Sequence, residues 1–84
     1  MKMFRLNKEY TIVCESKPTR RGFKHEATLL WNGEEVDSAK VIYYNRTWEM
    51  YRYQSVILEL INKTEYGTER QRSLWRTKAN RGVL

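Results

Sequence analysis

Residues 29–36 read LLWNGEEV, and this stretch decides the fold. Asn and Gly both accept the positive φ that a two-residue turn of type I′ requires, so Asn32-Gly33 predicts a hairpin. Before the turn, residues 23–31 alternate between two faces with the period of a strand. After the turn, another strand is expected from about Val36 to Tyr44, so this part of the chain predicts an antiparallel sheet.

The turn leaves the register of the strand after it open between two alternatives. A two-residue turn places Leu29 beside Val36 and puts Ile42 and Tyr44 on the core face. A bulged or longer turn selects the opposite face of the same strand for the core. The residues on that opposite face are Ala39, Val41 and Tyr43.

A first strand is expected upstream, from Tyr10 to Cys14, because β-branched and aromatic residues gather there. Tyr10, Ile12 and Cys14 share one face of this strand. The segment from Ser16 to Gly22 contains a proline, a glycine and three cations, so we interpret it as a loop at the tip of a hairpin.

A helix is expected after the third strand, with Asn45 as its N-cap and Thr47 as a competing cap. It runs to about Thr64 or Tyr66, and Gly67 is a natural stop. Its apolar residues fall on one side at about 100° per residue, which is typical of a helix that lies on a sheet. These residues are Met50, Tyr53, Val56, Ile57, Leu60 and Ile61.

The sequence therefore predicts an α+β fold in which a three-stranded antiparallel sheet packs against one amphipathic helix. Residues 1–67 form this single domain in the order β-β-β-α. Residues 68–84 are either a short second helix docked through Trp75 or a mobile basic tail. Their charged side chains are one carboxylate and several cations, Glu69 against Arg70, Arg72, Arg76, Lys78 and Arg81.

The composition of the chain favours a polyanionic partner. Lys and Arg number 16 against 10 Asp and Glu, which gives a net charge of +6 and a pI near 9.7. Nucleic acid is the leading partner class on this basis. The alternative is that the charge only keeps a small protein in solution.

The single Cys14 and the single His25 argue against metal binding and catalysis. One cysteine excludes an internal disulfide and a cysteine-based zinc site, which suits a reducing, cytoplasmic setting. The sequence has neither a glycine-rich phosphate loop nor a plausible catalytic triad. It also has no apolar run of membrane-spanning length. We therefore expect a cytoplasmic binding protein that is not an enzyme, needs no cofactor and does not enter a membrane.

Four segments supply the candidate nucleic-acid contacts. The hairpin loop sets arginines where they can fork onto phosphates, although a solvated turn explains them equally well. The segment before the helix and the first helical turns combine cations with aromatic rings, as base-stacking surfaces do, although capping and packing also explain them. The basic C-terminal residues suit a polyanion or simply a soluble end. The candidates are Lys17, Arg20, Arg21, Lys24, Arg46, Trp48, Arg52, Arg76 and Lys78.

The order of elements resembles the small DNA-binding domains at the N-termini of some phage and transposon integrases. The correspondence covers about two thirds of the chain and rests on Arg20-Arg21-Gly22-Phe23, the Asn32-Gly33 hairpin and the helix from Trp48. Such a domain lays its sheet face in the major groove, which implies DNA rather than RNA as the partner. The chain departs from this pattern because the second face of its sheet includes Glu15 and Glu26. The chain also resembles small uncharacterised phage and prophage accessory proteins.

Two hypotheses for function follow. The first is a DNA-binding module that contacts phosphates through the hairpin loop and the C-terminal cations. The alternative is a phage-encoded module that binds an acidic host protein, with Trp48, Tyr51 and Trp75 as anchors. A strand edge from Tyr10 to Glu15 is also expected to allow a homodimer.

Overall fold

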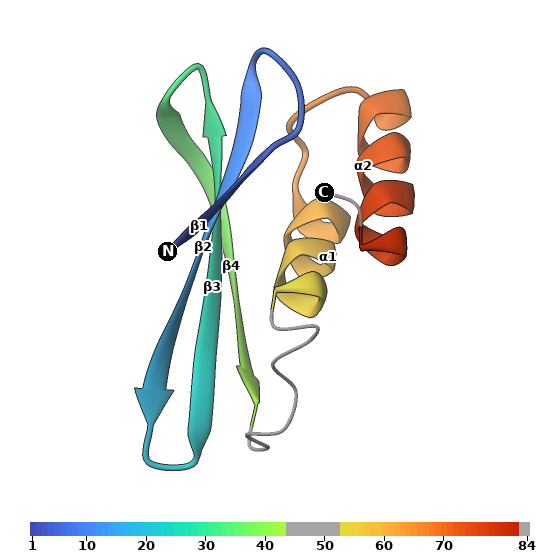
Figure 1. Ribbon diagram of the computed structural model, residues 1–84. Coiled ribbons are helices and arrows are strands. Elements are labelled where there is room, and N and C mark those ends of the chain that lie inside the picture. Colours follow the sequence, from blue (N-terminus) through green and yellow to red (C-terminus); the bar gives the residue numbers. More distant parts are fainter. Residues whose placement is uncertain (44–52, 83–84) are drawn as a thin grey trace.

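The computed structural model describes residues 1–43 and 53–82, which form a four-stranded sheet and two helices (Figure 1). The strands pair antiparallel in chain order, and both helices lie on one face of the sheet (Figure 1). The predicted α+β class is confirmed, whereas the prediction of three strands and one helix is wrong. The elements are β1 (Lys2–Arg5), β2 (Tyr10–Thr19), β3 (Gly22–Trp31), β4 (Glu34–Tyr43), α1 (Gln54–Lys63) and α2 (Glu69–Arg81).

Strand β1 is the element that the sequence prediction missed. Its residues Lys2–Arg5 pair with residues 11–14 of β2. The turn between the two strands is held by Asn7, whose side-chain oxygen accepts two backbone amides at 2.8 and 2.7 Å. Because β1 covers this stretch of β2, the predicted free edge from Tyr10 to Glu15 is wrong for the paired residues. They have no open edge with which to form a dimer.

Strands β2 and β3 form a longer hairpin than the sequence predicts. Their pairing runs as far as Thr19 opposite Gly22, so the predicted loop over residues 16–22 is a turn of two residues only. Pro18 belongs to β2, at a position that β1 does not reach. Proline lacks an amide hydrogen and is tolerated at such a free edge, which explains why a strand continues through it.

The Asn32-Gly33 hairpin between β3 and β4 is confirmed. The two residues adopt φ values of 50° and 87°, as a type I′ turn requires. A register shift between Leu29 and Leu30 marks a bulge beyond this turn. The bulge selects the second of the two predicted faces, since Ala39 is buried whereas Ile42 is 52% exposed.

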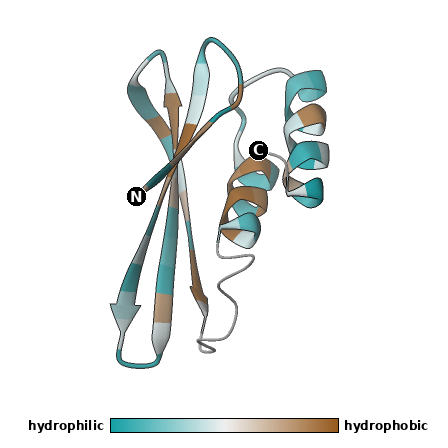
Figure 2. Cartoon of the chain, viewed as in Figure 1, coloured by the Kyte–Doolittle hydropathy of each residue, from teal (hydrophilic) through white to brown (hydrophobic). Residues whose placement is uncertain are grey.

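The core lies between the sheet and α1, and the predicted apolar faces of β2 and α1 are confirmed among the described residues, whereas Trp31 at the end of β3 is 41% exposed. Figure 2 shows the hydrophobic residues of α1, which form one buried face of the helix. Helix α1 begins at Gln54, and the expected caps Asn45 and Thr47 lie outside the described residues. Met50 and Tyr44 lie outside them as well. The buried apolar residues of the sheet and α1 are Tyr10, Ile12, Cys14, Ala27, Leu29, Ala39, Val56, Ile57, Leu60 and Ile61.

Residues 68–84 contain the first of the two predicted alternatives, a helix docked through Trp75. Helix α2 begins with a reciprocal capping box, in which Thr68 and Gln71 exchange hydrogen bonds of 3.1 and 2.9 Å between side chain and backbone. Trp75 is 2% exposed, and its ring lies 5.2 Å from that of Tyr10 on β2. Within the described ranges, neither helix combines the length and the apolar content needed to cross a membrane.

Candidate nucleic-acid interface

The turn between β2 and β3 presents two adjacent arginines to solvent. Arg20 and Arg21 are exposed and occupy the two turn positions. The hydroxyl of Thr19 donates to the carbonyl of Gly22 at 3.1 Å and accepts the amide of Arg21 at 3.4 Å. A threonine and the backbone therefore hold the turn, and the arginine side chains are not needed to close it.

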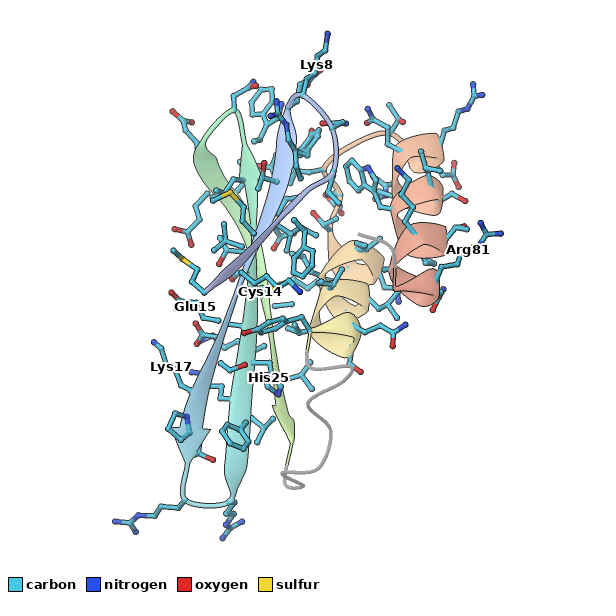
Figure 3. All side chains as sticks on the ribbon, in the orientation of Figure 1. Lys8, Cys14, Glu15, Lys17, His25 and Arg81 are labelled. Carbon is cyan, nitrogen blue, oxygen red and sulfur yellow. The ribbon has the colours of Figure 1, made fainter. Side chains whose placement is uncertain are left out.

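The turn lies at the far end of the sheet from the β1–β2 turn and extends past the N-terminal end of α1 (Figure 1). Lys17, labelled in Figure 3, is exposed near the same end of β2. We refer to Lys17, Arg20 and Arg21 as the hairpin tip. Three cations within five residues of chain thus meet solvent at one end of the sheet, where β4 accompanies β3 as far as Phe23.

Lys24 differs from the residues of the hairpin tip because it is already paired. It faces Lys17 across the strands, on the side of the sheet away from the helices. Its ammonium lies 2.9 Å from the carboxylate of Glu26, and this hydrogen bond is the main reason why the pKa of Glu26 is lowered. Glu26 in turn faces Glu15 on β2. The outer face of the sheet therefore carries charges of both signs rather than a uniform basic surface.

The predicted C-terminal cations divide into two kinds. Arg76 is partly buried, and its Nε donates to the side-chain oxygen of Asn62 on α1 at 2.7 Å. Arg72 donates to three carbonyls of the loop between the helices, the shortest bond being 2.8 Å to Gly67. Lys78, in contrast, is exposed. Arg76 thus holds the two helices together, whereas Lys78 is open to a partner.

Two exposed cations of α2 were not among the predicted site residues. Arg70 and Arg81 are both exposed, on the side of the helix away from Trp75. The helical period measured from Trp75 identifies them, since residues five or six positions away are rotated from it by about 140° or 120° around the helix axis. The sequence predicts their exposure only for the alternative in which residues 68–84 form a helix.

The hairpin tip and the cations of α2 lie far apart in the described part of the molecule. In Figure 3, Lys17 is on the sheet side and Arg81 is on the opposite side, beyond α1. The exposed residues of α1 between them are Ser55, Glu59, Asn62 and Lys63, and Lys63 is paired with Asp37 at 3.3 Å. The cations are therefore not arranged as one continuous basic stripe through the described residues.

The remaining predicted residues either lie outside the described residues or are buried. Arg46, Trp48 and Arg52 lie outside the described residues, as does Tyr51. Trp75 is almost fully buried against the sheet, so its prediction as an exposed anchor for a protein partner is wrong. The hypothesis of a protein partner requires the ring of Trp75 on the surface, but this ring packs in the core beneath α2.

The cysteine and the histidine both lie in the core. Cys14 is fully buried, and burial raises the pKa of its thiol to about 12, an effect that the nearby Lys2 only partly offsets. The thiol therefore stays protonated and is a poor nucleophile near neutral pH. His25 is hydrogen bonded through Nδ1 to the hydroxyl of Ser16, and its ring lies 5.9 Å from that of Tyr53. Among the described residues, no three His, Cys, Asp or Glu side chains are grouped as metal ligands would be.

Comparison of this chain with protein-family models, with curated proteins and with solved structures finds no match. Function is therefore inferred from the exposed chemistry of the chain itself. Within the described ranges, two groups of exposed cations are the hairpin tip and the outer side of α2, and further exposed cations are Lys2, Arg5, Lys8, Lys40 and Lys63.

Proposed function

We propose that this chain is a DNA-binding protein without catalytic activity, and that it contacts the phosphate backbone through the hairpin tip. The observation that carries the proposal is the pair of exposed arginines at a hairpin turn that extends past α1, just beyond the point where β4 ends opposite Phe23. Each guanidinium can donate two parallel hydrogen bonds to one phosphate. Lys17 adds a point charge on the same hairpin.

The shape of the hairpin turn favours DNA over RNA. Because β4 runs beside β3 as far as Phe23, only the turn itself can enter a groove, and the wide major groove of B-form DNA lets its arginines approach the phosphates. The major groove of an A-form RNA helix is deep and narrow, and it excludes such an element. A basic hairpin end therefore fits a DNA duplex better than an RNA duplex.

The proposal agrees with the resemblance to integrase DNA-binding domains in its partner, DNA, but differs in the surface that contacts it. In those domains the face of the sheet lies in the groove. Here the outer face combines Lys24, already paired with Glu26, with a second carboxylate at Glu15. Carboxylates are repelled by phosphates, so we place the end of the hairpin, rather than the sheet face, against DNA.

Fluorescence anisotropy tests the proposal directly. The chain is titrated against mixed-sequence duplex DNA, single-stranded DNA and duplex RNA at low and physiological salt. Duplex DNA is expected to bind most tightly. The double variant Arg20→Ala/Arg21→Ala is expected to bind it more weakly, with the slope of log K against log salt reduced by about 0.9 per lost phosphate contact.

The matched control is Lys8→Ala/Lys40→Ala, which removes the same charge from two other exposed positions. Figure 3 shows Lys8 at the end of the molecule away from the hairpin tip. If the control weakens binding as much as the tip variant does, net charge and not the tip is responsible. Failure of the wild-type chain to bind any of the three nucleic acids at low salt would contradict the proposed function itself.

A further inference from the structure

Helix α2 has a second set of exposed cations that the fold does not use. Trp75 and Ala79 are buried and define the inner side of this helix. At about 100° per residue, the exposed residues of the helix lie within about half a turn on the other side. We call this surface the α2 outer face, and it consists of Glu69, Arg70, Ser73, Leu74, Thr77, Lys78, Asn80 and Arg81, all of them exposed.

The cations on the inner side of α2 make hydrogen bonds within the fold, whereas those on its outer side are exposed. The two that face inward, Arg72 and Arg76, are hydrogen bonded to the interhelical loop and to α1. The three on the outer face have only one carboxylate on the same helix, Glu69 in its first turn. The packing of α2 therefore uses Arg72 and Arg76, and the cations of the outer face are not needed to hold the helix in place.

The chemistry of the α2 outer face suits a phosphate backbone better than a protein surface. The core of a protein interface is a patch of adjoining apolar side chains, largely free of charge. On this face Leu74, 54% exposed, is the one large apolar side chain, and it stands among cations and hydroxyls. A helix of 13 residues is about 20 Å long, and one helix fits the major groove of DNA.

We propose that the α2 outer face is a second DNA-binding surface, so that one chain bridges two DNA segments. The inference rests on the proposed function of the hairpin tip. The two surfaces lie on opposite sides of the molecule, as Lys17 and Arg81 show in Figure 3. Between them, the exposed side of α1 includes Glu59, and its Lys63 is paired with Asp37. Two separate duplexes can therefore each contact positive charge, one at the hairpin tip and the other at the α2 outer face, on opposite sides of the molecule.

Bridging is measured by energy transfer between two short duplexes of the same sequence, one carrying a donor dye and the other an acceptor. The wild-type chain is expected to bring the two dyes together when it is present at less than one chain per duplex. A large excess of protein is expected to abolish the transfer, because each duplex then binds its own chain. Anisotropy on the same samples reports binding to a single duplex independently of bridging.

Two variants remove one surface each and the same amount of charge. Arg20→Ala/Arg21→Ala removes two of the three cations of the hairpin tip, and Arg70→Ala/Lys78→Ala removes two of the three cations of the α2 outer face. Each is expected to retain binding to one duplex and to lose energy transfer to background. The control Lys8→Ala/Lys40→Ala is expected to bridge like wild type. Circular dichroism of each variant checks that the fold is retained.

The outcomes separate the two proposals. Binding and energy transfer by Arg70→Ala/Lys78→Ala at wild-type levels would show that the α2 outer face does not contact DNA, and would leave a protein partner as its remaining use. Energy transfer restored by an equal mixture of the two surface variants would show that bridging arises from a dimer, and would also overturn the inference. Binding without energy transfer would refute the second surface alone, whereas no binding at all would refute both proposals.

Discussion

Individual arginines of similar sequence context have different roles in this chain. Arg70 and Arg72 lie on the same turn of α2, yet the first is exposed and the second donates to the carbonyl of Gly67. A guanidinium that donates to carbonyls of the loop between the helices is part of the fold. The net charge of the sequence therefore overstates the charge that is available to a partner, and only burial and hydrogen bonding distinguish the two kinds of cation.

At the same scale, Gly67 is expected to tolerate no side chain. Its φ is 80°, and a Cβ built there would lie 2.7 Å from the ring of Trp75. Positive φ costs an alanine about 1 kcal/mol, and overpacking against a buried ring adds about 1–3 kcal/mol. Gly67→Ala is therefore expected to lower the free energy of unfolding by about 2–4 kcal/mol, measured by urea denaturation.

Gly82 provides the matched control for this substitution. Its φ is 70°, but a Cβ there meets no atom within 4 Å. Gly82→Ala is expected to cost only the backbone strain, about 1 kcal/mol. Equal losses for the two variants would show that the contact with Trp75 is unimportant and that the loop between the helices adapts.

At the scale of elements, the bulge in β4 has a specific consequence for α1. It places Asp37 beside the last turn of that helix, where the carboxylate lies 3.3 Å from the ammonium of Lys63. Burial alone raises the pKa of Asp37, but hydrogen bonds from Thr64, Ser38 and Lys63 outweigh it and lower the pKa below its ordinary value. One carboxylate thus joins the sheet to the helix end.

This connection is expected to make stability depend on pH. Because the folded pKa of Asp37 is lowered, the contribution is fully present above the unfolded pKa, about 3.9, and is lost as pH falls through the folded value. Asp37→Asn is therefore expected to lower the free energy of unfolding by about 1 kcal/mol at pH 7, with a smaller difference from wild type at pH 3. Glu59→Gln, at an exposed position on α1, is the control. A loss that is equal at both pH values would contradict the role of the charge.

The sequence predicted those elements whose signals are local. The Asn32-Gly33 turn, the alternation in β2 and the apolar face of α1 depend on neighbouring residues, and the structure contains all three. Strand β1 has four residues, too few to show a period, and it forms because β2 offers it an edge. Pro18 suggested a loop because its place at a free edge depends on where β1 lies.

The candidate site was predictable only in part, for the same reason. The position of Arg20 and Arg21 at a hairpin turn follows from the strands on either side, and the structure contains that turn. The pairing of Lys24 with Glu26 is visible in sequence once the strand is known, because the two residues share a face. The bond between Arg76 and Asn62 depends on how the helices pack, which no local pattern reveals.

At the scale of the whole molecule, the C-terminal helix completes the core rather than extending from it. A chain of 84 residues buries only about 60–65% of the surface that its unfolded form exposes, so each large buried ring contributes much of the stability. Trp75 supplies one such ring from near the end of the chain, against Tyr10 near its beginning. The described residues 1–43 and 53–82 thus share one core, to which α2 contributes Trp75 and Ala79.

Neighbouring residues on α2 test this dependence. Trp75→Ala removes a ring that is 2% exposed, and truncation of a buried tryptophan costs about 3–5 kcal/mol. Leu74→Ala removes a side chain that is 54% exposed, and it is expected to change the free energy of unfolding by no more than about 0.5 kcal/mol. Both are measured by urea denaturation followed by far-ultraviolet circular dichroism.

The expected result is one cooperative transition for wild type and for Leu74→Ala, and a much lower midpoint for Trp75→Ala. Because α2 closes the core against β2, loss of its anchoring ring weakens the sheet as well as the helix. If residues 68–84 were an independent basic tail, Trp75→Ala would leave the midpoint unchanged. Near-equal midpoints for the two variants would therefore contradict the docked helix and, with it, the fixed placement of the α2 outer face on which bridging depends.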